Sequence, residues 1–187
     1  PNALGDDEGQ MLLTLRSIVD ADTTVPVRIG VNKGPVFAGD IGPGYRRTYT
    51  VMGDAVNLAA RVMSMAVPGQ ILATGPVLDA AIEYATRNGA ILVAAAGNDQ
   101  AAQLAWPAAD PRVVSVGAVD RLEQQVTFSN SGAQLQLTAP GYGVQTAWLD
   151  GQRVYVDGTS ASAPLVAGAI AALLSQNPSL TPQQAAD

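Results

Sequence analysis

The chain has 187 residues and a formal net charge of −6, and 48% of its residues are hydrophobic while 14% are charged. This composition is typical of a globular protein, and the length suffices for one ordinary domain or two small ones. Ten basic residues scattered along an acidic chain do not form the electrostatic footprint of a nucleic-acid-binding protein.

Cysteine and histidine are both absent. Without Cys there is no disulfide, no thiolate metal site and no cysteine nucleophile. Without His the 187 residues contain no imidazole base, no His-ligated metal site and no complete Ser-His-Asp triad. We therefore expect no metal ligands, and no cofactor for the chain alone.

No segment is long enough to be predicted as a membrane span. The longest apolar stretch, residues 163–174, is interrupted by Pro164 and Gly168, and crossing a bilayer takes about 20 residues. The first residues lack both an initiator Met and the pattern of a signal peptide. Both ends suggest an excised fragment, and the localisation is left open.

Hydrophobic periodicity and turn residues predict the elements in chain order. The first half is predicted to contain a helix over residues 11–19, strands over 25–31, 36–38 and 48–52, and a helix over 54–66. A strand over 70–74, a helix over 76–88 and an apolar strand over 91–96 follow. The remainder is predicted to hold a strand over 113–119, short strands near Phe128 and over 135–138 and 154–156, and a helix over 160–176.

The alternation of strands and helices between residues 48 and 96 is typical of parallel α/β layering. Residues 91–96 have no polar side chain on either face, so both faces need a cover. We expect an α/β fold with one composite, mainly parallel sheet, helices on both faces, and residues 91–96 and 113–119 near the centre. The covering helices would be 76–88 and 160–176, the latter with an inward stripe of Leu165, Val166, Ala169, Ile170 and Leu173.

Two runs in the first half, Gly30–Gly42 and Arg46–Arg61, form a long motif. The motif resembles the C-terminal half of the class III nucleotidyl cyclase catalytic domain, over about residues 11–78. Asn57 and Arg61 are four residues apart on one predicted helix face, so both side chains can point at one ligand. The resemblance implies that Arg61 binds a phosphoryl group, that Asn57 orients the ribose, and that Thr50 reads adenine. The plainer interpretation is a solvated helix face capped by Asp54.

The resemblance also shows which cyclase parts are missing. The two metal-binding aspartates and an adenine-reading Lys belong to segments not found here, and Asp40 and Asp54 fall outside the metal motifs. Mg²⁺ or Mn²⁺ with ATP would be needed only if a partner completed the site, because the ions neutralise charge on the triphosphate. The partner would be a complementary half-domain or a second copy in a homodimer.

Several ordered motifs in the second half resemble subtilisin-like serine peptidases over about residues 79–187. They are Ala90–Asn98, Trp106–Ala108, Val113–Val119, Phe128–Gly132, Ala139–Gly141 and Gly158–Pro164. The resemblance implies that Ser160 is the nucleophile and that the Asn98 side-chain amide helps to form the oxyanion hole. Ser160 is predicted to begin a helix, where the helix dipole and its own N–H favour a developing anion.

The resemblance further implies a pocket for the substrate side chain. Its lining would be Ala94, Ala95, Ala96, Gly97, Trp106, Pro107 and Ala108, with a cis peptide bond between Trp106 and Pro107. The Asp and His of the family lie upstream, where this chain carries the cyclase-like run. The plainer interpretation of Ser160 is therefore a helix N-cap.

The two resemblances meet within residues 75–81, with no flexible linker between them. We expect a cyclase-like half-domain (residues 1–78) and a peptidase-like half-domain (residues 79–187) packed as one composite body. The leading interpretation is a chimera that is catalytically incomplete alone. The alternatives are a subtilase fragment, active only if Asp and His are supplied in trans, and a cyclase half-site that needs a partner for its metals.

Overall fold

The structure is a computed structural model that describes residues 7–21, 25–41, 43, 45, 48–181 and 184–185. Three residues of the two cyclase-like runs (42, 46 and 47), residue 44 between the runs, and both chain ends lie outside the described residues. The chain divides into two compact units, Pro1–Tyr84 and Ala85–Asp187, called unit 1 and unit 2 below.

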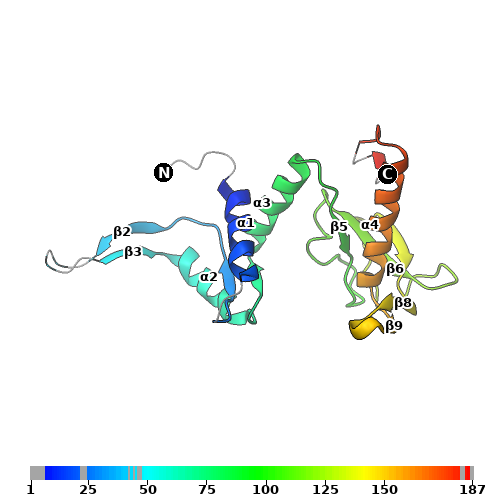
Figure 1. Cartoon of the computed structure of the whole chain (residues 1–187), viewed down its shortest axis with the longest axis horizontal. Coiled ribbons are helices and arrows are strands. Elements are labelled where there is room, and N and C mark those ends of the chain that lie inside the picture. Colours follow the sequence, from blue (N-terminus) through cyan, green and yellow to red (C-terminus); the bar gives the residue numbers. More distant parts are fainter. Residues whose placement is uncertain are drawn as a thin grey trace. The chain divides into compact units, whose positions relative to one another are not determined.

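Unit 1 combines helices with two pairs of strands (Figure 1). Its elements are α1 (Asp7–Asp20), β1 (Ile29–Val31), β2 (Phe37–Ile41), β3 (Thr48–Met52), α2 (Asp54–Met65), β4 (Ile71–Ala73) and α3 (Gly75–Arg87), the last of which runs across the division between the units. The strands β1 and β4 pair in parallel, whereas β2 and β3 form an antiparallel hairpin.

Close packing of α2 on β1 holds unit 1 together. A Cβ added to Gly30 would lie 2.3 Å from the carbonyl oxygen of Ala59, so the helix backbone rests directly on the strand. The Asn32 amide, just after β1, donates to the carbonyl of Ala55 at 3.0 Å and accepts from the Thr74 hydroxyl at 2.7 Å. These bonds tie the ends of β1 and β4 to the first turn of α2.

Unit 2 contains a parallel three-stranded sheet, a hairpin and one long helix (Figure 1). Its elements are β5 (Val93–Ala95), β6 (Val114–Val119), β7 (Leu137–Pro140), β8 (Val144–Ala147), the 3₁₀ turn η1 (Leu149–Gly151), β9 (Arg153–Val156) and α4 (Thr159–Gln176). The sheet has the order β5-β6-β7, and β8 pairs with β9 in antiparallel fashion.

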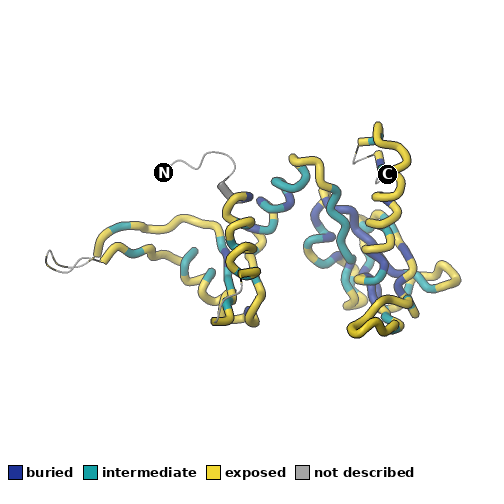
Figure 2. Tube along the Cα trace, viewed as in Figure 1, coloured by how far each residue is buried: buried dark blue, intermediate teal, exposed yellow. Residues whose placement is uncertain are grey.

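The core of unit 2 lies on the two faces of β6, the most deeply buried strand in Figure 2. On one face Val116 is fully buried beside Val114, and Ala163 and Val166 of α4 pack there. On the other face the loop between β5 and β6 contributes Leu104 and Ala108, which pack on Ala94 and Ala96. Because side chains of a strand alternate between faces, α4 covers one side of this sheet and loops cover the other.

The α/β class is confirmed, but the single sheet expected from the sequence is not. The strands β3 and β5 belong to different sheets, because β3 closes a hairpin on β2. The strand β5 is also an edge of its sheet rather than near the centre, and its residues are only half-buried. The expectation for residues 113–119 is confirmed, since β6 is the central strand.

Three local expectations are also corrected. The segment around Phe128 forms turns, because the Val126 amide returns to the Ala118 carbonyl and the chain then folds back on itself. The strand β8 was missed. In α4, Val166 and Ile170 of the expected inward stripe do face the core, beside the small residues Ser162 and Ala163. Leu165 and Leu173 of that stripe are instead 46% and 39% exposed.

Within the described residues, α4 is the one helix whose length and composition would allow it to cross a bilayer. Its contacts with β5, β6 and β7 are those of a helix that packs along a sheet.

Candidate functional site

The side chains of Asn98 and Thr159 form a clamp at the start of α4. The Asn98 Oδ1 atom accepts hydrogen bonds from the backbone N–H and from the hydroxyl of Thr159, both at 2.9 Å. Thr159 is fully buried, and its hydroxyl oxygen also accepts from the Gly97 N–H at 3.2 Å. Because Oδ1 is fully engaged, the orientation of the Asn98 amide is fixed and its Nδ2 donors face away from Thr159.

The Asn98 donors and Ser160 converge above Gly158. A Cβ placed on Gly158 would lie 3.0 Å from Ser160 Oγ, 3.4 Å from Asn98 Nδ2 and 3.7 Å from the Ser160 backbone nitrogen. These three polar atoms therefore border one position that only a glycine leaves open. Asn98 and Ser160, the two residues that the peptidase resemblance named as catalytic, thus lie near each other.

Ser160 is not the cap of α4. The N-cap is Gly158, at a φ of 151°, and Ser160 is the second residue of the helix. Within the part of the chain that the structure describes, the Ser160 hydroxyl makes no hydrogen bond, and the residue is exposed. The amide groups of a first helical turn also have no partner inside the helix. The interpretation of Ser160 as the helix N-cap is therefore wrong, and its hydroxyl is exposed.

A buried asparagine, to which the sequence analysis gave no role, shapes the turn that carries Asn98. Asn130 is 2% exposed, and its Oδ1 accepts from the backbone N–H groups of Asp99 and Ala101 at 2.9 and 3.0 Å. Its own N–H donates to the Gly97 carbonyl. Its place in the Phe128–Gly132 motif was the only signal available in the sequence.

The predicted pocket segments lie next to each other in unit 2. The Ala105 N–H donates to the Ala96 carbonyl at 2.8 Å, which brings the residues before Trp106 against the end of β5. The Trp106–Pro107 peptide bond is cis, as expected. Ala96 and Ala108 are buried in the core, whereas Trp106 is 59% exposed, so the side chains at these positions differ widely in access to a substrate.

An ion pair fixes the chain just after this segment. Asp110 is 3% exposed and accepts from the backbone N–H, Nε and guanidinium nitrogen of Arg112. These hydrogen bonds hold the pKa of the Asp110 carboxyl below its ordinary value. The pair anchors the turn that leads into β6.

The residues predicted from the cyclase resemblance all lie in unit 1. Asn57 and Arg61 are exposed on α2, and Thr50 is half-buried at the middle of β3. The N-cap of α2 is Gly53 rather than Asp54, which instead lies in the first helical turn. The described residues contain no group of three or more acidic side chains that could hold a metal ion.

Two pockets of about 320 Å³ lie elsewhere. One is in unit 1 between α1, α3 and the segment after β1, and its lining includes Met11, Val36 and Val77. The other lies in unit 2 between β7 and α4. Neither is lined by a residue predicted to be functional.

Comparisons with known proteins identify the family of the chain. The model of the subtilase family matches residues 26–187. Subtilisin BL of Lederbergia lenta is 38% identical over 102 residues, covering 54% of this chain and 38% of that protein. A subtilisin of Bacillus pumilus is 34% identical over 130 residues, covering 67% of this chain and 46% of that protein.

Solved structures give the same result. A cold-adapted subtilisin-like serine proteinase matches with a TM-score of 0.57 at 34% identity, covering 62% of this chain and 45% of that one. The prenylagaramide maturation protease PagA matches with a TM-score of 0.56 at 36% identity, covering 59% of this chain and 42% of that one. The chain thus spans less than half the length of these relatives. The family match begins well before residues 75–81, where the two resemblances were expected to meet.

Proposed function

Because this chain belongs to the subtilase family, we propose that it supplies the nucleophile and oxyanion hole of a serine endopeptidase. Ser160 would attack the substrate carbonyl, and the Asn98 Nδ2 group and the Ser160 N–H would stabilise the resulting oxyanion. The absence of His means that the base, with the Asp that orients it, would come in trans from outside these 187 residues.

The observation that carries this proposal is the clamp on Asn98. Two hydrogen bonds from Thr159 engage Oδ1 and leave the Nδ2 donors directed at the open position above Gly158, beside Ser160. Oxyanion stabilisation depends on donors that are fixed before the reaction, so that none must reorient as charge develops.

The edge of β5 indicates where a complementing segment would add. Within the described residues β5 pairs with β6 alone, and its second edge has no strand partner. An apolar strand with a free edge is a template for another strand. A segment that pairs there would cover β5 and bring its own side chains to the end of the sheet where Asn98 follows.

A labelling experiment tests the proposal. The chain is mixed with the part of Subtilisin BL that precedes the matched region, and a fluorophosphonate probe is added. We expect labelling and peptide hydrolysis only in the mixture, both abolished by Ser160→Ala and both retained in Ser175→Ala, a matched change on the exposed side of the same helix. The loss of one oxyanion donor costs about 10²–10³-fold in rate in subtilisin, and we expect a comparable loss for Asn98→Ala.

Two results would count against the proposal. Labelling of Ser175→Ala and Ser160→Ala at equal rates would mean that another residue reacts. A stable mixed complex, seen by sedimentation, that shows neither labelling nor hydrolysis would mean that Ser160 is not activated.

A second proposal is that unit 1 is the half-site of a nucleotidyl cyclase, which would make the chain a chimera. The observation that favours it is the exposure of Asn57 and Arg61 one turn apart on α2, where both are accessible to one nucleotide. Mg²⁺ or Mn²⁺ with ATP would bind only with a partner that supplies the metal ligands. Mixed with a complementary cyclase half-domain that supplies those ligands, the chain should then show a higher melting temperature with ATP and Mn²⁺, and Arg61→Ala should remove the rise. An unchanged melting temperature at saturating nucleotide would refute it.

A further inference from the structure

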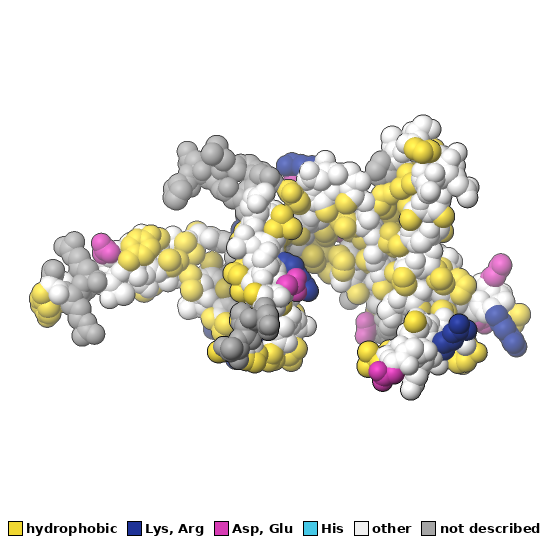
Figure 3. Space-filling view, in the orientation of Figure 1, with side chains coloured by type: hydrophobic (Ala, Val, Ile, Leu, Met, Phe, Trp, Pro, Cys, Tyr) yellow, Lys and Arg dark blue, Asp and Glu magenta, His cyan; other side chains and the backbone are white. Residues whose placement is uncertain are grey.

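The β2–β3 hairpin exposes large apolar side chains on both of its faces. In register, Phe37 lies opposite Met52, Ala38 opposite Val51, Gly39 opposite Thr50, Asp40 opposite Tyr49, and Ile41 opposite Thr48. Five apolar side chains are at least two-fifths exposed: Phe37 (57%), Ile41 (41%), Tyr49 (68%), Val51 (43%) and Met52 (47%). Figure 3 shows hydrophobic side chains along this hairpin, which Figure 1 shows reaching away from the helices of unit 1. A two-stranded ribbon with such faces is marginal in water unless something covers it.

The outer edge of β3 is the part of the hairpin best suited to gain a further strand. Within the described residues β3 pairs with β2 alone. Its sequence, Thr-Tyr-Thr-Val-Met, consists of aromatic, β-branched and apolar residues without charge, Pro or Gly. Natural edge strands are usually protected by charge, Pro or a bulge. The other edge, β2, carries Gly39 and Asp40, which disfavour strand pairing.

We propose that two copies of this chain associate by antiparallel pairing of β3 with the partner's β3, centred on Thr50. Of the possible registers, only the one centred on Thr50 pairs all five residues of β3. It sets Thr50 opposite the partner's Thr50, and Tyr49 opposite the partner's Val51. Threonine pairs and aromatic–β-branched pairs are favourable across antiparallel strands, and no charged residue lies on either β3.

The exposed area fits a weak dimer. An edge pairing at β3 reaches the exposed side chains of Tyr49, Val51 and Met52. Since a whole aromatic side chain presents about 150–250 Å², the exposed parts of these three offer on the order of 300 Å² per copy. This area is larger than that of a single exposed residue. It is smaller than the roughly 800 Å² that each partner buries in a standard interface. We therefore expect a dissociation constant on the order of 10–100 μM.

The lack of native Cys makes a direct test possible, because Thr50→Cys introduces a single thiol. Residues directly opposite in an antiparallel pair have Cα atoms about 4.5–5.5 Å apart, within the range that a disulfide spans. Under mild oxidation the full-length Thr50→Cys chain should form a covalent dimer. The matched control is Ala38→Cys on β2, which is also exposed but would lie three strand spacings, about 14 Å, from its copy. It should stay monomeric on denaturing gels.

Charge swapping gives an independent readout. Thr50→Lys and Thr50→Glu each place like charges opposite each other and should sediment as monomers, whereas an equimolar mixture should recover the dimer. Equal cross-linking of Ala38→Cys and Thr50→Cys would overturn the proposal. So would a wild-type chain that sediments as a monomer at 200 μM, about twice the weakest dissociation constant expected above, or a dimer that both charge variants leave intact.

Discussion

The two units bury their strands to very different degrees. In unit 2 every residue from Val113 to Ala118 is buried, and polar side chains such as Ser115 and Asn130 are buried with hydrogen bonds to backbone groups. In unit 1 the hairpin strands β2 and β3 each have a single half-buried residue, and α2 has no buried residue. Both units have similar lengths of chain, so the difference lies in how the strands are covered.

The contrast follows from how many strand partners and covered faces each strand has. The strand β6 has a partner on each edge, a helix on one face and a loop on the other. The hairpin strands have one partner each, and an isolated ribbon cannot bury both faces. The better-buried sheet therefore leads into the candidate catalytic residues, and the exposed hairpin is suited to association. Four predictions, which use five substitutions, test this contrast, and they follow from the largest expected effect to the smallest.

The tightest contact in unit 1 is the approach of α2 to β1 at Gly30. A methyl group there would meet the Ala59 carbonyl and the Met63 backbone nitrogen at 2.3 Å, and backbone atoms cannot turn aside as a side chain can. We expect Gly30→Ala to destabilise unit 1 by about 3 kcal/mol. Both tryptophans, Trp106 and Trp148, lie in unit 2, so tryptophan fluorescence reports that unit alone. Loss of helical circular dichroism with an unchanged tryptophan transition is the expected result, and a shifted tryptophan transition would mean that the units unfold together.

A valine-to-threonine pair compares the two sheets directly. Val116 in β6 is fully buried, whereas Val51 in β3 is 43% exposed. Burying an unpaired hydroxyl costs about 1–3 kcal/mol, while an exposed substitution stays within about 0.5 kcal/mol. Val116→Thr should therefore lower the urea midpoint of the tryptophan transition, and Val51→Thr should leave the circular dichroism transition unchanged. Similar losses at both positions would contradict the contrast in burial.

The buried pair Asp110–Arg112 gives unit 2 a stability that depends on pH. Its hydrogen bonds hold the folded-state pKa of Asp110 below 3.8, so the unfolded chain takes up the proton first as pH falls. The stabilisation that the ionised carboxylate provides is complete above the unfolded-state pKa. It is lost as pH falls through the lower folded-state pKa. Asp110→Asn should cost about 1.5 kcal/mol at pH 7, since Arg112 is one-third exposed and water partly replaces the bond.

The pH dependence provides the check on Asp110. The difference between wild type and Asp110→Asn in tryptophan-detected unfolding should shrink on acidification to pH 3. A difference that stays constant from pH 7 to pH 3 would show that the ionised carboxylate is not what stabilises the turn.

Sequence patterns correctly predicted the helices and strands that are determined by neighbouring residues. The bounds of β3 match the expected strand at residues 48–52, and the cores of α2, α3 and α4 were identified from their periodicity. The partner with which a strand pairs is not determined by the residues of that strand alone. Nothing in Thr48–Met52 distinguishes a hairpin strand from one in a parallel sheet, and β8 lacks the apolar alternation that would mark it.

The candidate site shows the same limit. Ser160 and Asn98 were named from family motifs, and they lie near each other. Thr159 and Asn130 were given no role, because their contribution is the direction in which side-chain oxygens point, and a sequence does not record direction. The catalytic roles of Ser160 and Asn98, and those of Asn57, Arg61 and Thr50, stay predictions.

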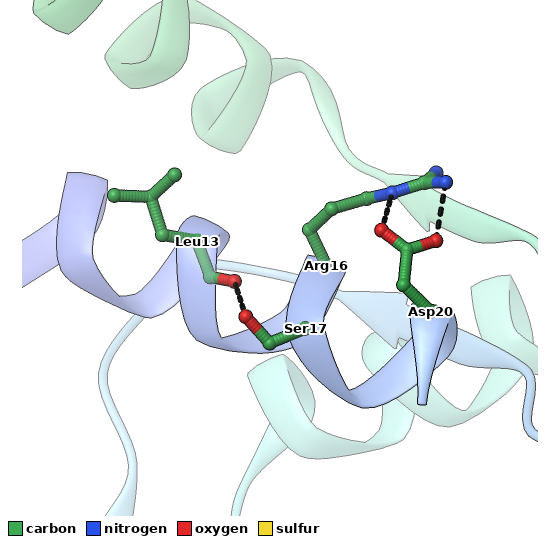
Figure 4. A network of polar contacts seen from close by, with 4 residues as sticks. All are labelled: Leu13, Arg16, Ser17 and Asp20. Carbon is green, nitrogen blue, oxygen red and sulfur yellow. Dashed lines mark hydrogen bonds and ion pairs between the residues drawn. The ribbon is translucent and has the colours of Figure 1, made fainter. Parts of the chain in front are cut away.

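The smallest effect is expected from the other aspartate–arginine pair. On α1 the Arg16 guanidinium donates two hydrogen bonds to Asp20, one turn along the helix, as Figure 4 shows. The chemistry matches that of Asp110 and Arg112, but these side chains are 66% and 52% exposed, so water competes for every donor and acceptor. Asp20→Asn should therefore leave the circular dichroism transition of unit 1 unchanged at physiological salt, where surface charges are screened. If Asp20→Asn destabilised the chain as much as Asp110→Asn does, burial would not be what separates the two pairs, and the contrast between the units would need another cause.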